Sequence, residues 1–179
     1  MKNIRAYVLL AASLILPTCL KAQATDSKID SLATAIARAE GFGRPHAIPT
    51  RYHNPGDLKS RPDYPKLPGQ KAIGKGGHII FKNDAAGWAA LKAQITKMSE
   101  GRSHHFKPDM TLMQVAKKYA GNWRPWIKIV SRTLDVSPTT TLMAYLTPEE
   151  LEAPSLDFSS PFDLSFLNTS ISLPVLAEN

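Results

Sequence analysis

The sequence predicts a mainly α fold of the α+β kind, in which a helical domain carries a small β-hairpin wing between its first and second helices. Three observations lead to this prediction. Apolar residues recur every three or four positions in several segments, which is the period of a helix that buries one face. Glycines and prolines crowd residues 46–82, between the first of these segments and the others. Two short β-forming runs lie inside that crowded region and predict a hairpin.

The first predicted helix ends on a carboxylate. Its apolar face is formed by residues three or four positions apart, namely Ile29, Leu32, Ala33, Ile36 and Ala37. The next step of three along that face reaches Glu40, and Gly41-Phe42-Gly43 then ends the helix. Burial and the negative end of the helix dipole both raise the pKa of a carboxyl group in this position, which suits it to act as a general acid. The alternative is an exposed helix-terminal acid that pairs with Arg38 or Arg44.

Capping and breaking residues mark the other elements. Thr25-Asp26-Ser27 offers N-cap side chains for the first helix, and residues 70–73 and 77–81 form the predicted hairpin. Asn83-Asp84 begins a second helix that Gly101 ends. Thr111 and Gln114 form a predicted capping box at the start of a third helix, which ends before Gly121.

Two further helices complete the predicted domain. Trp123-Arg124-Pro125-Trp126 opens one of them, with Pro125 at its first position. Ser137-Pro138 caps a last short helix that reaches Leu146.

The two ends of the chain differ from its middle. Residues 1–24 combine basic residues, an apolar run and the small-x-small sequence Ala22-Gln23-Ala24, and predict a signal peptide. The protein is therefore expected to be periplasmic or secreted, with no integral membrane segment after cleavage. A minor alternative is a lipid anchor at Cys19, the only cysteine. Residues 148–179 form an acidic, Pro/Ser-rich tail, expected to be disordered or loosely docked and able to bind a protein partner.

Charge is distributed unevenly along the chain. Residues 25–147 contain 19 basic and nine acidic residues, a net charge of +10, whereas six acidic residues and no Lys or Arg follow Leu146. Such a basic domain suggests an anionic partner: nucleic acid, a membrane surface or the polymers of a cell wall. The export signal argues against nucleic acid. The alternative is a solvated surface that keeps the protein soluble.

The order of elements resembles the lysozyme-like superfamily, most closely lytic transglycosylase-like and muramidase-like domains of bacteria and phages. The resemblance covers about residues 28–146 and is carried by Glu40-Gly41-Phe42, the loop 51–58, the hairpin and the helices after it. Within the loop, Asn54-Pro55-Gly56 followed by Asp57 is similar to a family sequence, and Tyr119-Ala120-Gly121-Asn122 is similar to a tyrosine segment bordering the family's site. The resemblance implies that residues 25–147 form a peptidoglycan-cleaving glycosidase domain that uses a single glutamate and no metal or cofactor.

Residue roles follow from the same resemblance. Glu40 matches the general acid. Asp57 is the candidate second carboxylate, acting as nucleophile, base or electrostatic stabiliser; the alternative is a turn residue that bonds its own backbone. The expected substrate-binding residues are Arg51, Asn54, Tyr119, Asn122 and Trp123. Asn54 and Tyr119 also have structural alternatives, as a turn-shaping residue and a core residue respectively.

Several functional alternatives stay open at this point. The Glu-Ser pair and the Gly-Leu-Met-Gln run of many soluble transglycosylases are absent, so both hydrolysis and transglycosylation are considered. If Asp57 takes no part, Glu40 acts first as acid and then as base, with the substrate's own hydroxyl or acetamido group as nucleophile. A noncatalytic glycan-binding module and a basic protein whose tail recruits a partner are the rival functions.

Overall fold

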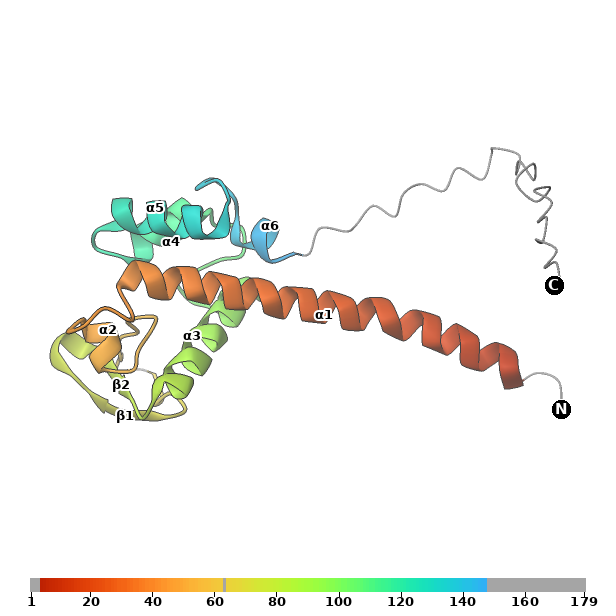
Figure 1. Cartoon of the computed structure of the whole chain (residues 1–179), viewed down its shortest axis with the longest axis horizontal. Coiled ribbons are helices and arrows are strands. Elements are labelled where there is room, and N and C mark those ends of the chain that lie inside the picture. Colours follow the sequence, from red (N-terminus) through yellow and green to blue (C-terminus); the bar gives the residue numbers. More distant parts are fainter. Residues whose placement is uncertain (1–3, 63, 148–179) are drawn as a thin grey trace, which may run out of the picture. The chain divides into compact units, whose positions relative to one another are not determined.

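The computed structural model describes residues 4–62 and 64–147, with side chains from residue 22 onward. In chain order its elements are α1 (Ile4–Glu40), α2 (Ile48–Arg51), β1 (Gln70–Ile73), the 3-10 turn η1 (Lys75–Gly77), β2 (Ile79–Phe81), α3 (Asp84–Ser99), α4 (Leu112–Tyr119), α5 (Trp123–Leu134) and α6 (Leu142–Leu146). The prediction of a mainly helical α+β fold with one small hairpin is confirmed. Figure 1 shows these elements along the chain.

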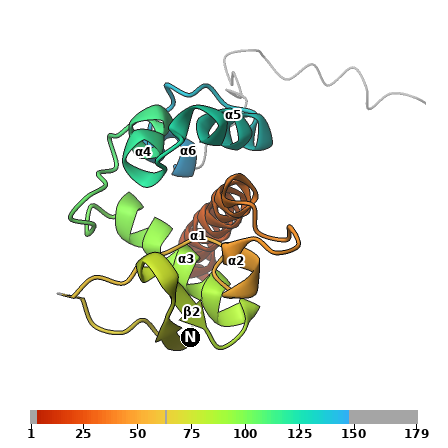
Figure 2. The same cartoon turned by 90° about the vertical axis from the view of Figure 1, so that its left-hand side faces the viewer.

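Helix α1 is the element on which the others pack. Viewed along its axis, α4, α5 and α6 lie on one side of it, and α2, α3 and β2 lie on the other (Figure 2). The five apolar residues predicted for its buried face are all at most 8% exposed. Four of them, all but Ala37, share one core cluster with buried residues of α3, α4, α5 and α6, including Leu91, Ile95, Leu112, Val130 and Leu142. Removal of these side chains from water is the main stabilising contribution to the fold.

The hairpin packs on α3. Strands β1 and β2 are antiparallel, with Gln70 opposite Phe81 and Ile73 opposite Ile79. Ile79 and Phe81 are buried together with Ala90 of α3, and Leu58 of the preceding loop packs against them. This second apolar cluster supports two strands that would be marginal in isolation.

The N-terminal boundary of the first helix differs from the prediction. Helix α1 begins at Ile4 and continues through Thr25-Asp26-Ser27, so the predicted start at those residues is wrong for the full chain. Apolar residues, many of them the helix-favouring Leu and Ala, precede position 25, and the helix continues through Pro17. Of the α1 side chains from residue 22 onward, Ile29 is the first that is buried. Cleavage after residue 24 stays a prediction, and it would leave this core-forming part of α1 intact.

Three smaller boundaries also differ. The proline-rich region holds the short helix α2, which has Pro49 in its first turn, where a missing N–H is tolerated. Pro125 lies at the third rather than the first position of α5. The cap of α6 is Thr141, whose hydroxyl accepts the backbone N–H of Ala144, rather than Ser137.

Other caps agree with the prediction. The side chain of Asn83 accepts the backbone N–H of Ala86 at the start of α3. Thr111 and Gln114 form the capping box of α4. Within the residues that the structure describes, no helix combines the length and apolar character needed to cross a membrane. The predictions for residues 148–179 lie outside the described residues.

Candidate functional site

Glu40, the last residue of α1, is half-buried and faces the aromatic side chains of α4 and α5. The indole Nε1–H of Trp126 donates to its Oε1 at 2.7 Å. Burial raises the pKa of Glu40 from 4.5 to about 7, against the lowering effect of the Trp126 hydrogen bond. The nearby charge of Asp57 raises this pKa further, and that of Lys59 lowers it. Glu40 therefore keeps its proton to a higher pH than an ordinary glutamate does.

Asp57 provides a second carboxyl group within electrostatic range of Glu40. Its Oδ1 lies 2.6 Å from Nδ1 of His78, and the side chains of His78 and Asp57 are 14% and 23% exposed. Burial raises the pKa of Asp57, while the neighbouring His78 and Lys59 lower it. Asp57 adopts a positive φ of 47°, a conformation that Asp tolerates better than most residues. Its carboxyl is thus held by a side chain of the hairpin region rather than bonded to its own turn.

Asn54 shapes the loop that carries Asp57. Its side chain has no exposed surface. The amide nitrogen donates to the carbonyl oxygens of Leu58 and Ile79, both at 2.9 Å, and the amide oxygen accepts the Leu58 N–H at 2.8 Å. These bonds join the loop to β2. The structure thus accounts for Asn54 as a loop-shaping residue, and the expected direct contact with substrate is not available to a side chain without exposed surface.

Tyr119 connects α4 to the same loop. Its hydroxyl donates to the Gly56 carbonyl at 2.6 Å, and its ring packs against that of Trp126 with centroids 5.4 Å apart. A Cβ on Gly56 would lie 2.7 Å from Leu91 and 3.1 Å from the Tyr119 hydroxyl, so only glycine fits there without displacement. Burial, together with the charges of Glu40 and Asp57, raises the pKa of Tyr119. Tyr119 therefore stays neutral and acts as a hydrogen-bond donor.

The remaining predicted site residues have partners other than the two carboxyl groups. Arg51 is exposed, with its guanidinium 5.7 Å from the centroid of the Tyr52 ring. Asn122 is the exposed N-cap of α5 and makes no side-chain capping bond. Trp123 is half-buried, and the charged groups of Lys117 and Arg124 lie over its ring. No contact described in the structure joins any of these three predicted residues to Glu40 or Asp57, so their binding roles stay predictions.

Trp126 and His78 are site residues that the sequence does not single out. Trp126 lies on the inward stripe of α5 and is only 4% exposed, so its pattern is that of a core residue. His78 precedes β2 and forms an isolated antiparallel bridge with Lys59, which brings the Asp57 loop beside it. Both contacts join residues distant in the chain, and neither leaves a local sequence signal.

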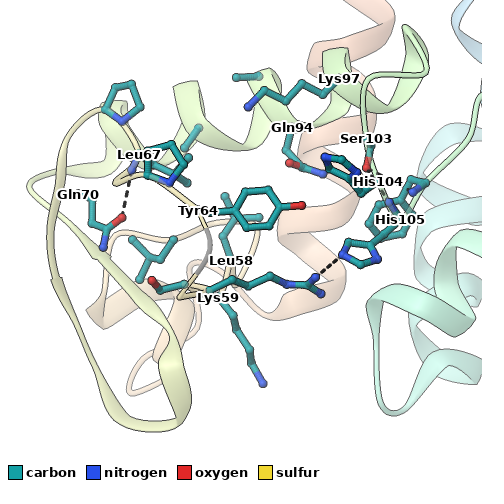
Figure 3. A pocket seen from close by; sticks show the side chains of 18 of the residues that line it. Leu58, Lys59, Tyr64, Leu67, Gln70, Gln94, Lys97, Ser103, His104 and His105 are labelled. Carbon is teal, nitrogen blue, oxygen red and sulfur yellow. Dashed lines mark hydrogen bonds between the residues drawn. The ribbon is translucent and has the colours of Figure 1, made fainter.

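A cavity of about 710 Å³ is lined by Leu58, Lys59 and Tyr119, which are neighbours of the site residues. Residues 58–61 and 64–70, helix α3 and the segment 102–106 form most of its walls, and Figure 3 shows most of its lining side chains. Glu40 and Asp57 do not line it. Tyr119 and Lys59 do line it. The Tyr119 hydroxyl bonds the Gly56 carbonyl, next to Asp57, and the charge of Lys59 lowers the pKa of Glu40.

Comparison of the chain with protein-family models, with curated proteins and with solved structures finds no match. Among the described residues, no three His, Cys, Asp or Glu side chains gather as metal ligands would. Function is therefore inferred from the half-buried Glu40, its tryptophan donor and the Asp57 carboxyl beside it.

Proposed function

We propose that this protein cleaves the glycan strands of peptidoglycan, with Glu40 as the general acid. The observation that supports the proposal best is a helix-terminal glutamate whose pKa burial raises to about 7. Cleavage of a glycosidic bond requires a proton on the leaving oxygen while positive charge develops on the sugar ring. Lysozyme is the familiar example of an enzyme whose catalytic carboxyl group keeps its proton in an apolar setting, and the analogy extends only to this physical effect.

Each neighbour of Glu40 has a defined effect on the proposed reaction. The Trp126 N–H fixes one carboxyl oxygen and stabilises the anion that remains after the proton is given up. Tyr119 holds the Gly56 carbonyl, and so the position of the adjacent Asp57. In an ionised state Asp57 would lie close enough to Glu40 to stabilise positive charge on the ring.

Two routes complete the reaction. In the first, Asp57 acts as nucleophile or as base toward water, and the product carries a reducing end. In the second, Glu40 takes back the proton as the substrate's own hydroxyl attacks, and the product is an anhydro sugar. The His78 contact leaves one Asp57 oxygen for substrate, which is compatible with the first route, and the proton affinity of Glu40 is compatible with both.

The proposed setting follows from the ends and the charge of the chain. Residues 1–24 have the composition of an export signal, and the domain's net charge of +10 suits an anionic wall polymer. We therefore propose a periplasmic or secreted enzyme that needs no cofactor.

The test is digestion of purified cell walls by the protein and by Glu40→Gln. Gln retains an acceptor for Trp126 but cannot donate an acidic proton, so we expect release of soluble fragments to fall by about 10²-fold or more. Mass analysis of the fragments separates the two routes, because an anhydro end is lighter by one water.

Asp109→Asn is the matched control, since it removes one carboxylate from an exposed position outside the site. It should release fragments at the unaltered rate. Equal release by the protein and by Glu40→Gln would refute the acid role. Wall binding without any release, retained in Glu40→Gln, would support the rival function of a noncatalytic glycan-binding module.

A further inference from the structure

The cavity lined by Lys59 and Tyr119 has an apolar part, called its floor below. Leu58, Ile79, Ala90 and Phe106 are among its lining residues, and Ile79, Ala90 and Phe106 are each at most 9% exposed. Such a surface gains free energy when an aliphatic group displaces water from it. The floor is therefore suited to the hydrocarbon part of a ligand.

The rim of the same cavity is cationic. Lys59, Arg61, Lys97 and Arg102 line it, and none of its described lining residues is acidic. Figure 3 shows the Lys59 and Lys97 side chains, whose amino groups lie at opposite sides of the view. Arg102 is already paired with Glu100. Within residues 4–62 and 64–147, Lys59, Arg61 and Lys97 form no ion pair with a carboxylate.

Arg61 lies beside two histidines, His104 and His105, that also line the cavity. Arg61 contacts Nε2 of His105. The charge of Arg61, followed by smaller effects that include Lys118 and His104, lowers the pKa of His105. Concentration of like charge around one cavity is unfavourable in the free protein, and an anion bound there would relieve it.

We infer that this cavity binds a short acidic peptide, with its carboxylates at Arg61 and Lys97 and its aliphatic side chains on the apolar lining residues. A neutral sugar would leave the cationic rim unused, and a bare inorganic anion would leave the floor unused. If the proposed function holds, this peptide is the stem peptide carried by the glycan strand, since Tyr119 of the cavity lining bonds the Gly56 carbonyl and Lys59 of the lining acts electrostatically on Glu40.

The test is direct binding to the full chain carrying Glu40→Gln, so that no cleavage interferes. The probe is N-acetylmuramyl-L-alanyl-D-glutamate, and its diamide is the neutral control; calorimetry measures both affinities. Because exposed ion pairs are individually weak, Arg61→Gln/Lys97→Gln should weaken binding of the acidic probe by roughly three- to tenfold. The diamide should bind more weakly than the acid and be indifferent to that double variant.

Lys128→Gln/Arg132→Gln is the matched control, because it removes two exposed cations of α5 that do not line the cavity. It should leave both affinities unchanged. Equal affinities for the acid and the diamide, or equal losses in the two double variants, would overturn the inference.

A second variant tests whether acidic residues of the chain itself, rather than a separate peptide, occupy the cavity. Glu149, Glu150 and Glu152 follow α6 and lie outside the described residues. Their joint replacement by Gln should leave the probe's affinity unchanged. A severalfold gain would show that the tail competes for the cavity and would overturn assignment of the site to a peptide ligand.

This result is separable from the proposed cleavage. Acid-selective binding that depends on Arg61 and Lys97, together with walls that stay intact, would refute the proposed enzyme activity and retain the peptide site. Cleavage that requires Glu40, together with binding that ignores Arg61 and Lys97, would retain the enzyme and refute the peptide site.

Discussion

At the scale of single residues, two opposing effects set the proton affinity of Glu40. Burial removes water from the carboxylate and raises its pKa, whereas the Trp126 N–H stabilises the carboxylate and lowers the pKa. The value of about 7 shows that burial is the larger effect. Trp126 thereby keeps Glu40 able both to hold and to release a proton near neutral pH.

The raised pKa of Glu40 predicts a pH-dependent change in stability. Below pH 4.5 the Glu40 carboxyl is largely protonated in both the folded and the unfolded chain. Between pH 4.5 and about 7 the unfolded chain loses the Glu40 proton more readily than the folded chain does. The ionisation of Glu40 therefore destabilises the fold as pH rises. Glu40→Gln removes that ionisation. It should raise the free energy of unfolding by about 1–3 kcal/mol at pH 8 and by little at pH 4.

Urea unfolding of the protein and of Glu40→Gln at the two pH values measures this difference. Asp109→Asn serves again as control and should show no comparable gain. A stabilisation by Glu40→Gln that is equal at pH 4 and pH 8 would contradict a raised pKa, since it would come from packing rather than from charge.

Removal of the indole donor predicts a shift in the pH dependence of cleavage. Without the Trp126 hydrogen bond the carboxylate is less stable, so in Trp126→Phe the alkaline limb of kcat/KM should move to higher pH by about 1. The control is Trp88→Phe, whose ring packs edge-on against Phe42 with centroids 5.6 Å apart. A shift to lower pH in Trp126→Phe, or equal shifts in both variants, would contradict the assigned effect of the indole.

At the scale of elements, the site depends on the packing of the loop 53–58 against β2 and α3. Asn54 joins the loop to β2 through Ile79, and the His53 carbonyl approaches α3 at Gly87. A Cβ on Gly87 would collide with that carbonyl oxygen and would lie 2.8 Å from Cδ of Pro55. The absence of a side chain at Gly87 thus fixes how closely the loop approaches the helix.

Gly87→Ala should therefore destabilise the protein by about 1–3 kcal/mol and lower wall cleavage, because the loop that carries Asp57 must move. Gly121→Ala is the matched control, since a Cβ there meets nothing within 4 Å. Thermal unfolding and fragment release measure the two effects. A neutral Gly87→Ala would show that the loop adapts freely and does not depend on this contact.

The elements also show which features can be predicted from sequence. The buried stripe that ends at Glu40, the hairpin and the Asn83 and Thr111 caps are local patterns, and each is found as predicted. Helix α2 escapes prediction because Pro49 is typical of a helix breaker unless its position in a first turn is known. The predicted start of α1 is too late because a capping sequence does not stop a helix already formed by the apolar residues before it.

The site is predictable only in part, because a local pattern is visible in the sequence and a contact between distant residues is not. Glu40 lies on a periodic face, and a pattern can reveal it. The pairing of Asp57 with His78 and of Glu40 with Trp126 joins residues 21 and 86 positions apart, so it depends on how elements pack. The sequence favours a ligand-binding and a turn-shaping role for Asn54 equally, and only its three hydrogen bonds to backbone groups distinguish the two.

At the scale of the whole molecule, charge is the property that relates the domain to its proposed substrate. The +10 charge of residues 25–147 predicts that wall binding depends on salt. With the screening length falling from about 10 Å at 0.1 M to about 3 Å at 1 M salt, retention of Glu40→Gln on purified walls should fall by about tenfold or more. Retention on neutral chitin is the control, and a salt response equal on both materials would contradict charge-based recognition.

The most direct test of the central claim is a pH titration of Glu40 itself. The side-chain carboxyl carbon, labelled with ¹³C and assigned by its absence in Glu40→Gln, should titrate with a midpoint near pH 7. The alkaline limb of wall cleavage should share that midpoint. A midpoint near the ordinary value of 4.5, or cleavage that persists unchanged well above pH 7, would contradict the assignment of Glu40 as the proton donor.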